Sequence, residues 1–307
     1  MNKEQADHVL GLRPGTLVEV RSEAEIRATL DPDGMLEGLP VMPEMDRFYG
    51  KVVMVHKRAD KTCVDSHGMR RMRNTVFLKD VRCNGSAHDG CDRLCAIFWK
   101  EAWLKPAPPS SPVADILLRD LVAGVTAPAE VDPGKTFACQ STALLQATAP
   151  LPWWDLSQYG GDLHRGQLGW AEFAKMFTIL LINKIRRPLG LAEYHALQGG
   201  NTRTPKVSLG LRPGDIVCLK SKEEIRGTLD GQGKTRGLEF SPEMTPYCGG
   251  RFTVLKRGSR MIVETTGKMI ALNDSVLLEG LFCDGSSHRG CKRENLFFCK
   301  EAWLRRV

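Results

Sequence analysis

The sequence predicts a mainly β protein with an α insert (α+β), in which two copies of one small β-barrel are joined by a helical middle domain. Three observations carry this prediction: a long internal repeat, short apolar β-type segments within each copy, and helical periodicity between the copies. Of the 307 residues, 42% are hydrophobic and 26% are charged. These values are typical of a globular protein, and they exclude a disordered chain, a collagen-like protein or a coiled-coil rod.

The internal repeat covers roughly 95 residues at each end of the chain. The first copy begins with LGLRPGTLVEV at Leu10, and the second begins with LGLRPGDIVCL at Leu209. Corresponding positions lie 199 residues apart at first and 200 apart by Cys83 and Cys283, so the second copy contains one inserted residue. Matching of this length indicates a duplication, and we expect both copies to share one fold.

Each copy is predicted to be a small SH3-like β-barrel with one short helix. Strands are expected at 16–20, 51–56 and 75–78, with counterparts at 215–219, 251–256 and 275–278. Ser22 and Ser221 occupy N-cap positions, and the glutamate three residues after each has the spacing of a capping box. The helices would run to Leu30 and Leu229. Several short strands, one short helix and Pro-Gly turns together favour this barrel.

The segment between the copies has a different composition. A proline-rich run, KPAPPSSP, starts at Lys105 and ends the first barrel. Helices are predicted after it, over 113–122, 140–147 and 169–187. The expected domains are 1–105 for the first barrel with its metal loop, 106–205 for the linker and helical insert, and 206–307 for the second barrel with its metal loop.

A loop rich in cysteine and histidine predicts a metal site in the first copy. Cys83, His88, Cys91 and Cys95 offer four ligands within one short segment, and glycines between them permit tight turns. Zinc prefers a tetrahedral set of thiolates and imidazoles, and four such ligands from one loop are usual for a structural site. The alternative is that these are small buried side chains of the barrel. We expect one or two zinc ions per chain, and ligand type alone does not separate zinc from iron.

The second copy keeps three of the four ligand positions. Cys283, His288 and Cys291 are present, whereas Asn295 stands at the fourth position. Cys299, four residues further on, is the candidate that would complete the tetrahedron. One alternative is an open site whose fourth position takes water or substrate, as in catalytic zinc enzymes; another is a decayed site that binds no metal.

Few residues outside the loops suggest catalysis. Cys139 precedes a predicted helix, whose N-terminus would lower the pKa of the thiol, and His164 is the candidate base for this nucleophile. Packing of a small side chain is the alternative for Cys139. Cys63, Cys218 and Cys248 receive no role. No phosphate-binding loop, nucleophile elbow, dinucleotide-binding fingerprint or zinc-protease motif occurs in the sequence.

Two further short segments each have a structural and a functional interpretation. The basic run MRRMR, starting at Met69, is typical of a solvated loop, and the alternative is contact with an anion or phosphate. The run PWWD, starting at Pro152, is typical of packing between parts of the chain, and the alternative is an aromatic wall for a ligand.

Several blocks of the chain resemble those of a bacterial group of proteins. The blocks are LRPG-x-x-V, PEM-x-x-[YF], C-[ND]-G-S-x-H-x-G-C and KEAWL, and the resemblance extends over nearly the whole chain. The group resembled consists of uncharacterised bacterial proteins with two zinc-ligating SH3-like barrel repeats around a helical insert, associated with specialised-metabolite gene clusters. The resemblance implies a biosynthetic setting and no particular catalytic residue.

Two functional classes follow from these observations. The first is a zinc-binding tandem-barrel protein of a bacterial small-molecule pathway, which would act on a small molecule or a carrier-bound substrate as a metal- or thiol-dependent tailoring enzyme. The alternative is a non-catalytic, zinc-stapled scaffold that recognises a protein, a carrier domain or nucleic acid. Nucleic acid is the least expected of these partners, because no platform of aromatic and basic residues is present.

Charge and cysteine content bear on the compartment and the partners. The net charge of +7 is mild for this length and permits an acidic partner without requiring one. The first fifteen residues lack an apolar segment, and the longest apolar stretch is about half as long as a membrane span. A cytoplasmic protein without a membrane partner is therefore expected. In a reducing compartment, ten cysteines are more economically explained as metal ligands or buried thiols than as disulfides.

Overall fold

The computed structural model describes residues 9–307, which divide into two compact units. The first unit contains residues up to 173 together with 262–269 and 291–293, and the rest of the chain forms the second unit. Two short segments of the second repeat are therefore counted with the first unit. The eight N-terminal residues, on which part of the expectation about a secretory segment depends, lie outside the described residues.

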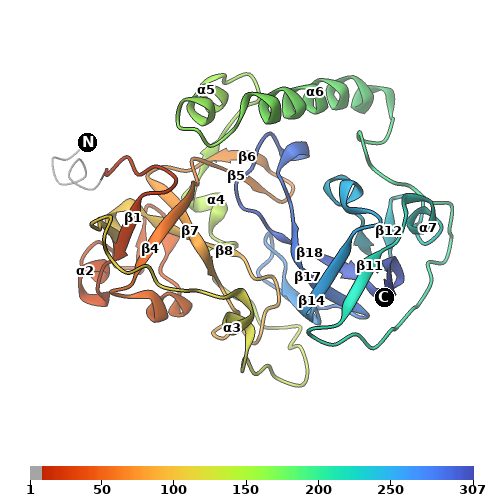
Figure 1. Ribbon diagram of the computed structural model, residues 1–307, viewed down its shortest axis with the longest axis horizontal. Helices are drawn as coiled ribbons and strands as arrows, with labels where there is room; N and C mark the ends of the chain where they lie inside the picture. The colour runs from red at the N-terminus through yellow and green to blue at the C-terminus, as the bar shows by residue number, and fades with distance from the viewer. Residues whose placement is uncertain (1–8) are drawn as a thin grey trace. The chain divides into compact units, whose positions relative to one another are not determined.

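The first repeat is built on a curled antiparallel sheet with the strand order β8-β7-β4-β1-β9 (Figure 1). A separate small sheet has the order β10-β6-β5, in which β10 (Ala149–Pro150) comes from the middle of the chain. The elements of this repeat are β1 (Leu17–Val20), α2 (Glu23–Arg27), β2 (Met35–Leu36), β3 (Leu39–Pro40), the 3-10 helix η1 (Pro43–Phe48), β4 (Val52–Arg58), β5 (Lys61–Val64), β6 (Gly68–Arg71), β7 (Thr75–Arg82), β8 (Ala96–Lys100), η2 (Glu101–Trp103) and β9 (Leu104–Pro106).

The second repeat contains a sheet of the same design, with the order β18-β17-β14-β11-β19. Its elements are β11 (Ile216–Leu219), α7 (Lys222–Arg226), β12 (Lys234–Thr235), β13 (Leu238–Glu239), η4 (Pro242–Tyr247), β14 (Arg251–Arg257), β15 (Arg260–Ile262), β16 (Met269–Ala271), β17 (Ser275–Phe282), η5 (Ser286–His288), β18 (Leu296–Lys300), η6 (Glu301–Trp303) and β19 (Leu304–Arg306).

Strand registers match between the two repeats. Val55 pairs with Leu78 and Val254 with Leu278, and each pair is followed by an irregularity in the register. The structure thus confirms a mainly β protein with two curled half-barrel sheets of equivalent topology.

The predicted capping boxes are present in both repeats. The Ser22 hydroxyl accepts a hydrogen bond from the backbone nitrogen of Glu25 at 3.4 Å, and the Glu25 carboxylate accepts one from the nitrogen of Ser22 at 2.9 Å. The same reciprocal pair closes the start of α7. Both helices end earlier than predicted, at Arg27 and Arg226, and the chain then turns towards the next strands.

A buried glutamate of the KEAWL block ties the end of each repeat to its beginning. The Glu101 carboxylate accepts hydrogen bonds from the backbone nitrogens of residues 10–12 at 2.7 to 3.1 Å and forms an ion pair with Arg58 at 2.5 Å. Glu301 has an equivalent place and pairs with Arg257 at 3.2 Å. Because both glutamates are fully buried, these partners are needed to offset their desolvation.

Each repeat also has its own hydrophobic core. Trp103 and Trp303 are fully buried in the two cores. The indole nitrogens donate hydrogen bonds to the hydroxyls of Thr29 at 3.1 Å and Thr235 at 2.9 Å. The polar edge of each ring is therefore satisfied while its apolar body fills the core.

The middle of the chain contains less helix than the sequence predicts. Its elements are α3 (Leu118–Val122), α4 (Leu144–Ala147), β10 (Ala149–Pro150), α5 (Ser157–His164), α6 (Trp170–Arg186) and η3 (Arg187–Leu189). Only α6 matches a predicted helix closely, because it alone carries a sustained helical pattern. The predicted helices at 113–122 and 140–147 are reduced to their last turns, and α5 was not predicted.

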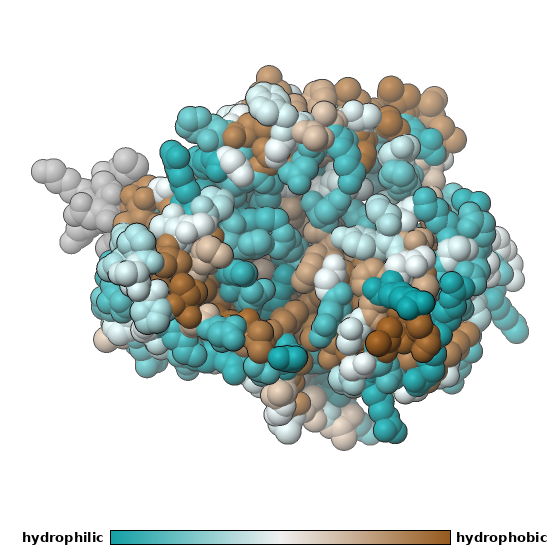
Figure 2. Space-filling model, in the orientation of Figure 1, coloured by the Kyte–Doolittle hydropathy of each residue, from teal (hydrophilic) through white to brown (hydrophobic). Residues whose placement is uncertain are grey.

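Hydrophobic residues are exposed along part of this region. In Figure 2 they gather over α6, where Trp170, Leu181 and Ile185 have exposed side chains. Within residues 9–307, no helix combines the length and the apolar character that a membrane-spanning segment requires.

Candidate metal centres

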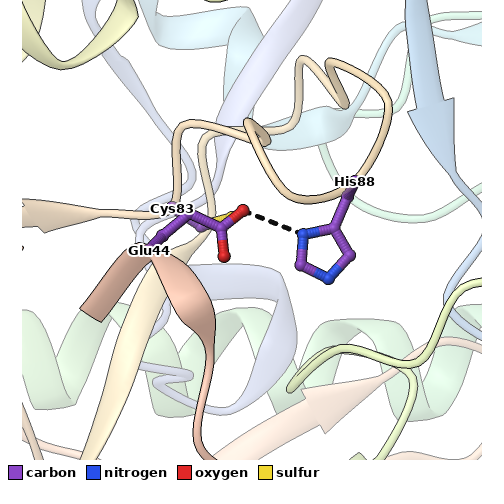
Figure 3. Close-up of side chains that lie close together, drawn as sticks. All are labelled: Glu44, Cys83 and His88. Carbon is purple, nitrogen blue, oxygen red and sulfur yellow. Dashed lines mark hydrogen bonds and ion pairs between the residues drawn. The ribbon is translucent and has the colours of Figure 1, made fainter. Parts of the chain in front are cut away.

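The first candidate metal centre joins a glutamate to the predicted cysteine and histidine (Figure 3). Glu44 comes from η1, Cys83 directly follows β7, and His88 lies in the loop after it. Ligand atoms of these three residues lie within 4.8 Å of one another, so the group could hold a metal ion. The Glu44 Oε1 atom is 2.8 Å from His88 Nδ1 and 3.5 Å from Cys83 Sγ. The side chains of His88 and Glu44 are 7% and 1% exposed, and Cys83 is partly buried.

Electrostatics favour a cation beside Glu44. Burial alone would raise the pKa of this carboxyl, but the hydrogen bond and charge of His88 bring the pKa below its ordinary value. Burial opposes the charged form of His88 as well, and the same contact with Glu44 raises the pKa of the imidazole. The second carboxylate oxygen, Oε2, is buried without a hydrogen-bond partner among the described residues. A buried carboxylate with one orphaned oxygen fits a site completed by a cation.

The four predicted ligands of the first loop line one small cavity, and of these only Cys83 and His88 belong to the close group with Glu44. Cys83, His88, Cys91 and Cys95 all line this space, whose volume is about 30 Å³. A space of this size is enough for one ion or one water molecule. Burial raises the pKa of Cys91 to about 11 and that of Cys83 well above its ordinary value. These thiols would therefore need a bound cation to become thiolates at neutral pH.

Glycine shapes the backbone of the first loop, as its sequence predicts. Gly85 has φ of +76°, and a Cβ atom there would lie 2.2 Å from the carbonyl oxygen of Cys91. Its own carbonyl accepts hydrogen bonds from the nitrogens of His88 and Gly90, each at 3.0 Å. The turn that presents His88 to the cavity thus requires glycine at position 85.

The second repeat contains an equivalent group in a more open setting. Ligand atoms of Glu243, Cys283 and His288 lie within 4.8 Å of one another, and this group could also hold a metal ion. His288 Nδ1 is 2.8 Å from Glu243 Oε1, the same distance as in the first repeat. The side chain of His288 is 49% exposed, whereas that of Glu243 is fully buried. Solvent therefore reaches the second histidine but hardly reaches the first.

Cys299 has surroundings that do not suit a metal ligand. It pairs with Val276 across β17 and β18, and its side chain is fully buried in the hydrophobic core of the second repeat. Burial alone raises the pKa of this thiol strongly. The structure therefore gives no support to Cys299 as the ligand that completes the second set.

Cys291 instead lies beside Cys63, a cysteine for which the sequence predicts no role. Its Sγ atom is 3.2 Å from the Sγ of Cys63, and both residues belong to the first unit. The backbone nitrogen of Cys63 also donates to the Cys291 sulfur at 3.2 Å. These contacts lower the pKa of Cys291 to about 5, mainly through the hydrogen bond between the two thiols.

The predicted nucleophile and base have different surroundings. Cys139 lines the cavity of the first loop, and burial raises the pKa of its thiol, which is opposite to the expected shift. The reason is that α4 begins only at Leu144, so Cys139 does not lie at a helix N-terminus. His164 is exposed at the end of α5. The structure therefore does not support the predicted pairing of these two residues.

Sequence reasoning missed the two glutamates and the thiol partner of Cys291. Glu44 and Glu243 each lie in a Pro-Glu-Met block that recurs at the constant offset of the repeat. A charged residue kept between two apolar ones in both copies was the available signal. Cys63 offered no local signal, because it is separated from Cys291 by 228 positions.

A polar pocket of about 320 Å³ lies in the first unit, between the β5–β6 region and α5. Five cationic and two anionic side chains line it: Arg58, Lys61, Arg71, Arg73, Arg165, Asp60 and Asp162. Two of the arginines, Arg71 and Arg73, belong to the basic run noted in the sequence. The described contacts show an ion pair of Arg71 with Asp155 at 2.6 Å and none for Arg73, which is exposed.

Comparison with known proteins found no match: no protein-family model, no curated protein and no solved structure matches the chain.

Proposed function

We propose that this chain is a zinc-binding protein with two SH3-like barrel repeats, in which the first loop holds a structural zinc ion. The single observation that carries the proposal is the close group of Glu44, Cys83 and His88, whose ligand atoms lie within 4.8 Å of one another beside a cavity that Cys91 and Cys95 also line. With Cys91 and Cys95 as further ligands, this group would offer the three thiols and one imidazole that suit the preference of zinc for soft, tetrahedral ligand sets. Such an ion would staple a loop that has little regular structure of its own.

Glu44 is assigned a supporting role at this site. Its hydrogen bond to His88 Nδ1 leaves the Nε2 atom of the ring for the metal. Nε2 is 3.3 Å from the carbonyl oxygen of Ala138, so its proton would have to leave when a metal ion binds. A carboxylate behind a metal-binding imidazole orients the ring and increases its basicity.

Metal analysis of the purified protein tests this proposal. We expect up to two zinc equivalents per chain, and Cys91→Ser should remove the equivalent held by the first loop. Cys248→Ser is the matched control, because Cys248 lies outside both loops and both candidate groups. Folded wild-type protein that contains no metal after gentle purification would overturn the proposal.

A second proposed function is the binding of an anionic small molecule in the polar pocket of the first unit. The excess of cationic over anionic lining residues favours this function, and the pocket volume lies at the lower end of that of small-molecule sites. Arg71 and Arg73 would supply the contact with phosphate or carboxylate groups. A ligand of this kind, free or attached to a carrier, suits a place in a bacterial small-molecule pathway better than a scaffold role.

Calorimetric titration with inorganic pyrophosphate tests the anion site. We expect Arg73→Gln to weaken binding by about tenfold, because one charge-assisted hydrogen bond to an anion is lost. Arg119→Gln is the control, since Arg119 is also exposed, in α3, but does not line the pocket. Equal binding by both variants would remove the pocket from the proposed function and leave the scaffold alternative.

A further inference from the structure

The cavity of the first metal loop is partly lined by a residue of the second repeat. Ile262 faces the same space as Cys83, His88, Cys91 and Cys95, and it is counted with the first unit. Its backbone nitrogen donates to the Cys91 sulfur at 3.4 Å, and its carbonyl oxygen accepts from Arg93 at 3.1 Å. Position 262 is therefore next to the proposed metal ligands of the first loop.

Cys63 makes the reciprocal set of contacts with residues of the second loop. Its backbone nitrogen donates to the Cys291 sulfur at 3.2 Å, and its carbonyl oxygen accepts from Arg293 at 3.0 Å. Cys63 and Ile262 occupy equivalent positions in the two repeats, as do Cys291 and Cys91. The backbone of Cys63 thus contacts Cys291 in the same way as the backbone of Ile262 contacts Cys91.

The two loops differ both in the fourth ligand position and in the residue that contacts the third ligand, and the two differences compensate each other. The first loop has its own fourth ligand, Cys95, and faces an isoleucine at position 262. The second loop has Asn295 at the fourth position, and the residue beside Cys291 is a cysteine. Each loop, taken with the residue that contacts its third ligand, therefore contains three cysteines and one histidine. This is the number that a tetrahedral zinc site requires.

We propose that Cys63 is a zinc ligand, which binds the same ion as Cys291 and replaces the missing fourth thiolate of the second loop. The distance of 3.2 Å between the two sulfurs places both thiols close enough for one ion to bind them. Cys299 is not needed, and its place in the apolar core agrees with this. This inference rests on the proposed zinc-binding function.

The zinc content of single variants provides the first test. Cys63→Ser should lose about one zinc equivalent per chain relative to wild type. Cys299→Ser should keep the wild-type zinc content and serves as the matched control. In cobalt-substituted protein, Cys63→Ser should also lose part of the thiolate-to-metal charge-transfer absorption, which a merely structural thiol would not change.

Two compensating double variants keep the test independent of folding defects. Cys63→Ser/Asn295→Cys gives the second loop the ligand pattern of the first and should regain the lost equivalent. Conversely, Cys95→Asn should lose the zinc of the first loop, and Cys95→Asn/Ile262→Cys should restore it. Restoration by a cysteine on the facing segment is expected only if positions 63 and 262 point at the metal ions.

The outcomes separate this inference from the proposed function. A wild-type protein without zinc would overturn both. Two zinc equivalents in wild type and also in Cys63→Ser, with an unchanged cobalt spectrum, would overturn only the ligand assignment. A Cys63–Cys291 disulfide in the purified protein, found by mass spectrometry without reduction, would overturn it too, because oxidised sulfurs cannot act as thiolate ligands.

Discussion

The two metal loops share a backbone design but differ in their access to solvent. His88 and His288 follow the same kind of glycine turn, and each lies 2.8 Å from a buried glutamate. The side chain of His88 is 7% exposed and that of His288 is 49% exposed. In the first repeat, the middle segment covers the histidine, whose Nε2 atom is near the carbonyl of Ala138. Duplication thus preserved the donor geometry while the surroundings diverged, which favours a structural ion in the first loop and a more exchangeable ion in the second.

Of the changes that distinguish the two loops, loss of a loop cysteine should have the largest effect on the free energy of unfolding. Cys83→Ser should lower the free energy of unfolding by several kcal/mol, because binding of a structural zinc ion contributes directly to folding. Cys283→Ser should cost less, since its histidine partner is already half exposed and hydrated. Chemical denaturation with and without a chelator measures both effects. Equal losses would show that solvent access does not distinguish the two sites.

Removal of the buried glutamates of the KEAWL blocks should cause the second-largest loss in the free energy of unfolding. Glu101→Ala should cost about 3 to 5 kcal/mol, because it removes the partner of the buried Arg58 and leaves backbone nitrogens unsatisfied. Glu301→Ala should cost less, since Arg257 is 46% exposed and can be hydrated when it is unpaired. Urea denaturation of the two variants tests the order, and a larger loss for Glu301→Ala would contradict it.

The glutamates behind the histidines should act on metal affinity rather than on the fold. Glu44→Gln and Glu243→Gln should each weaken zinc binding by about 10- to 100-fold, which is typical when the carboxylate partner of a metal-binding histidine is lost. Competition with a chromophoric chelator measures these affinities. Asp46→Asn, in the same 3-10 helix as Glu44 but outside the candidate group, is the control. An effect as large in Asp46→Asn would point to general destabilisation.

The smallest effect is expected at the helix caps, where the two repeats are alike. Ser22→Ala and Ser221→Ala should each cost about 1 kcal/mol, because each removes a hydroxyl that caps the first turn of a helix. Thermal denaturation should show similar shifts for the two variants. Clearly different shifts would mean that the repeats differ in stability even where their local structure matches.

The amino-acid sequence determined the features that depend on local patterns. The duplication, both capping boxes, helix α6 and the glycine turn of the first loop are all evident from residue spacing. In each case the interacting groups lie within a few residues of one another or repeat with a fixed period. Such features follow from backbone geometry and do not depend on how distant segments pack.

Only the tertiary structure decided which distant residues meet at the candidate sites. It brought Glu44 to His88 and Cys63 to Cys291, and it placed Cys299 inside an apolar core although its spacing suggested a ligand. It also gathered arginines into a polar pocket beside α5. Spacing in the sequence specifies which ligand types are available, but their convergence depends on packing between segments far apart in the chain. The cysteine that is missing at Asn295 is one example. Its proposed replacement, Cys63, is recognised only when the fold is known.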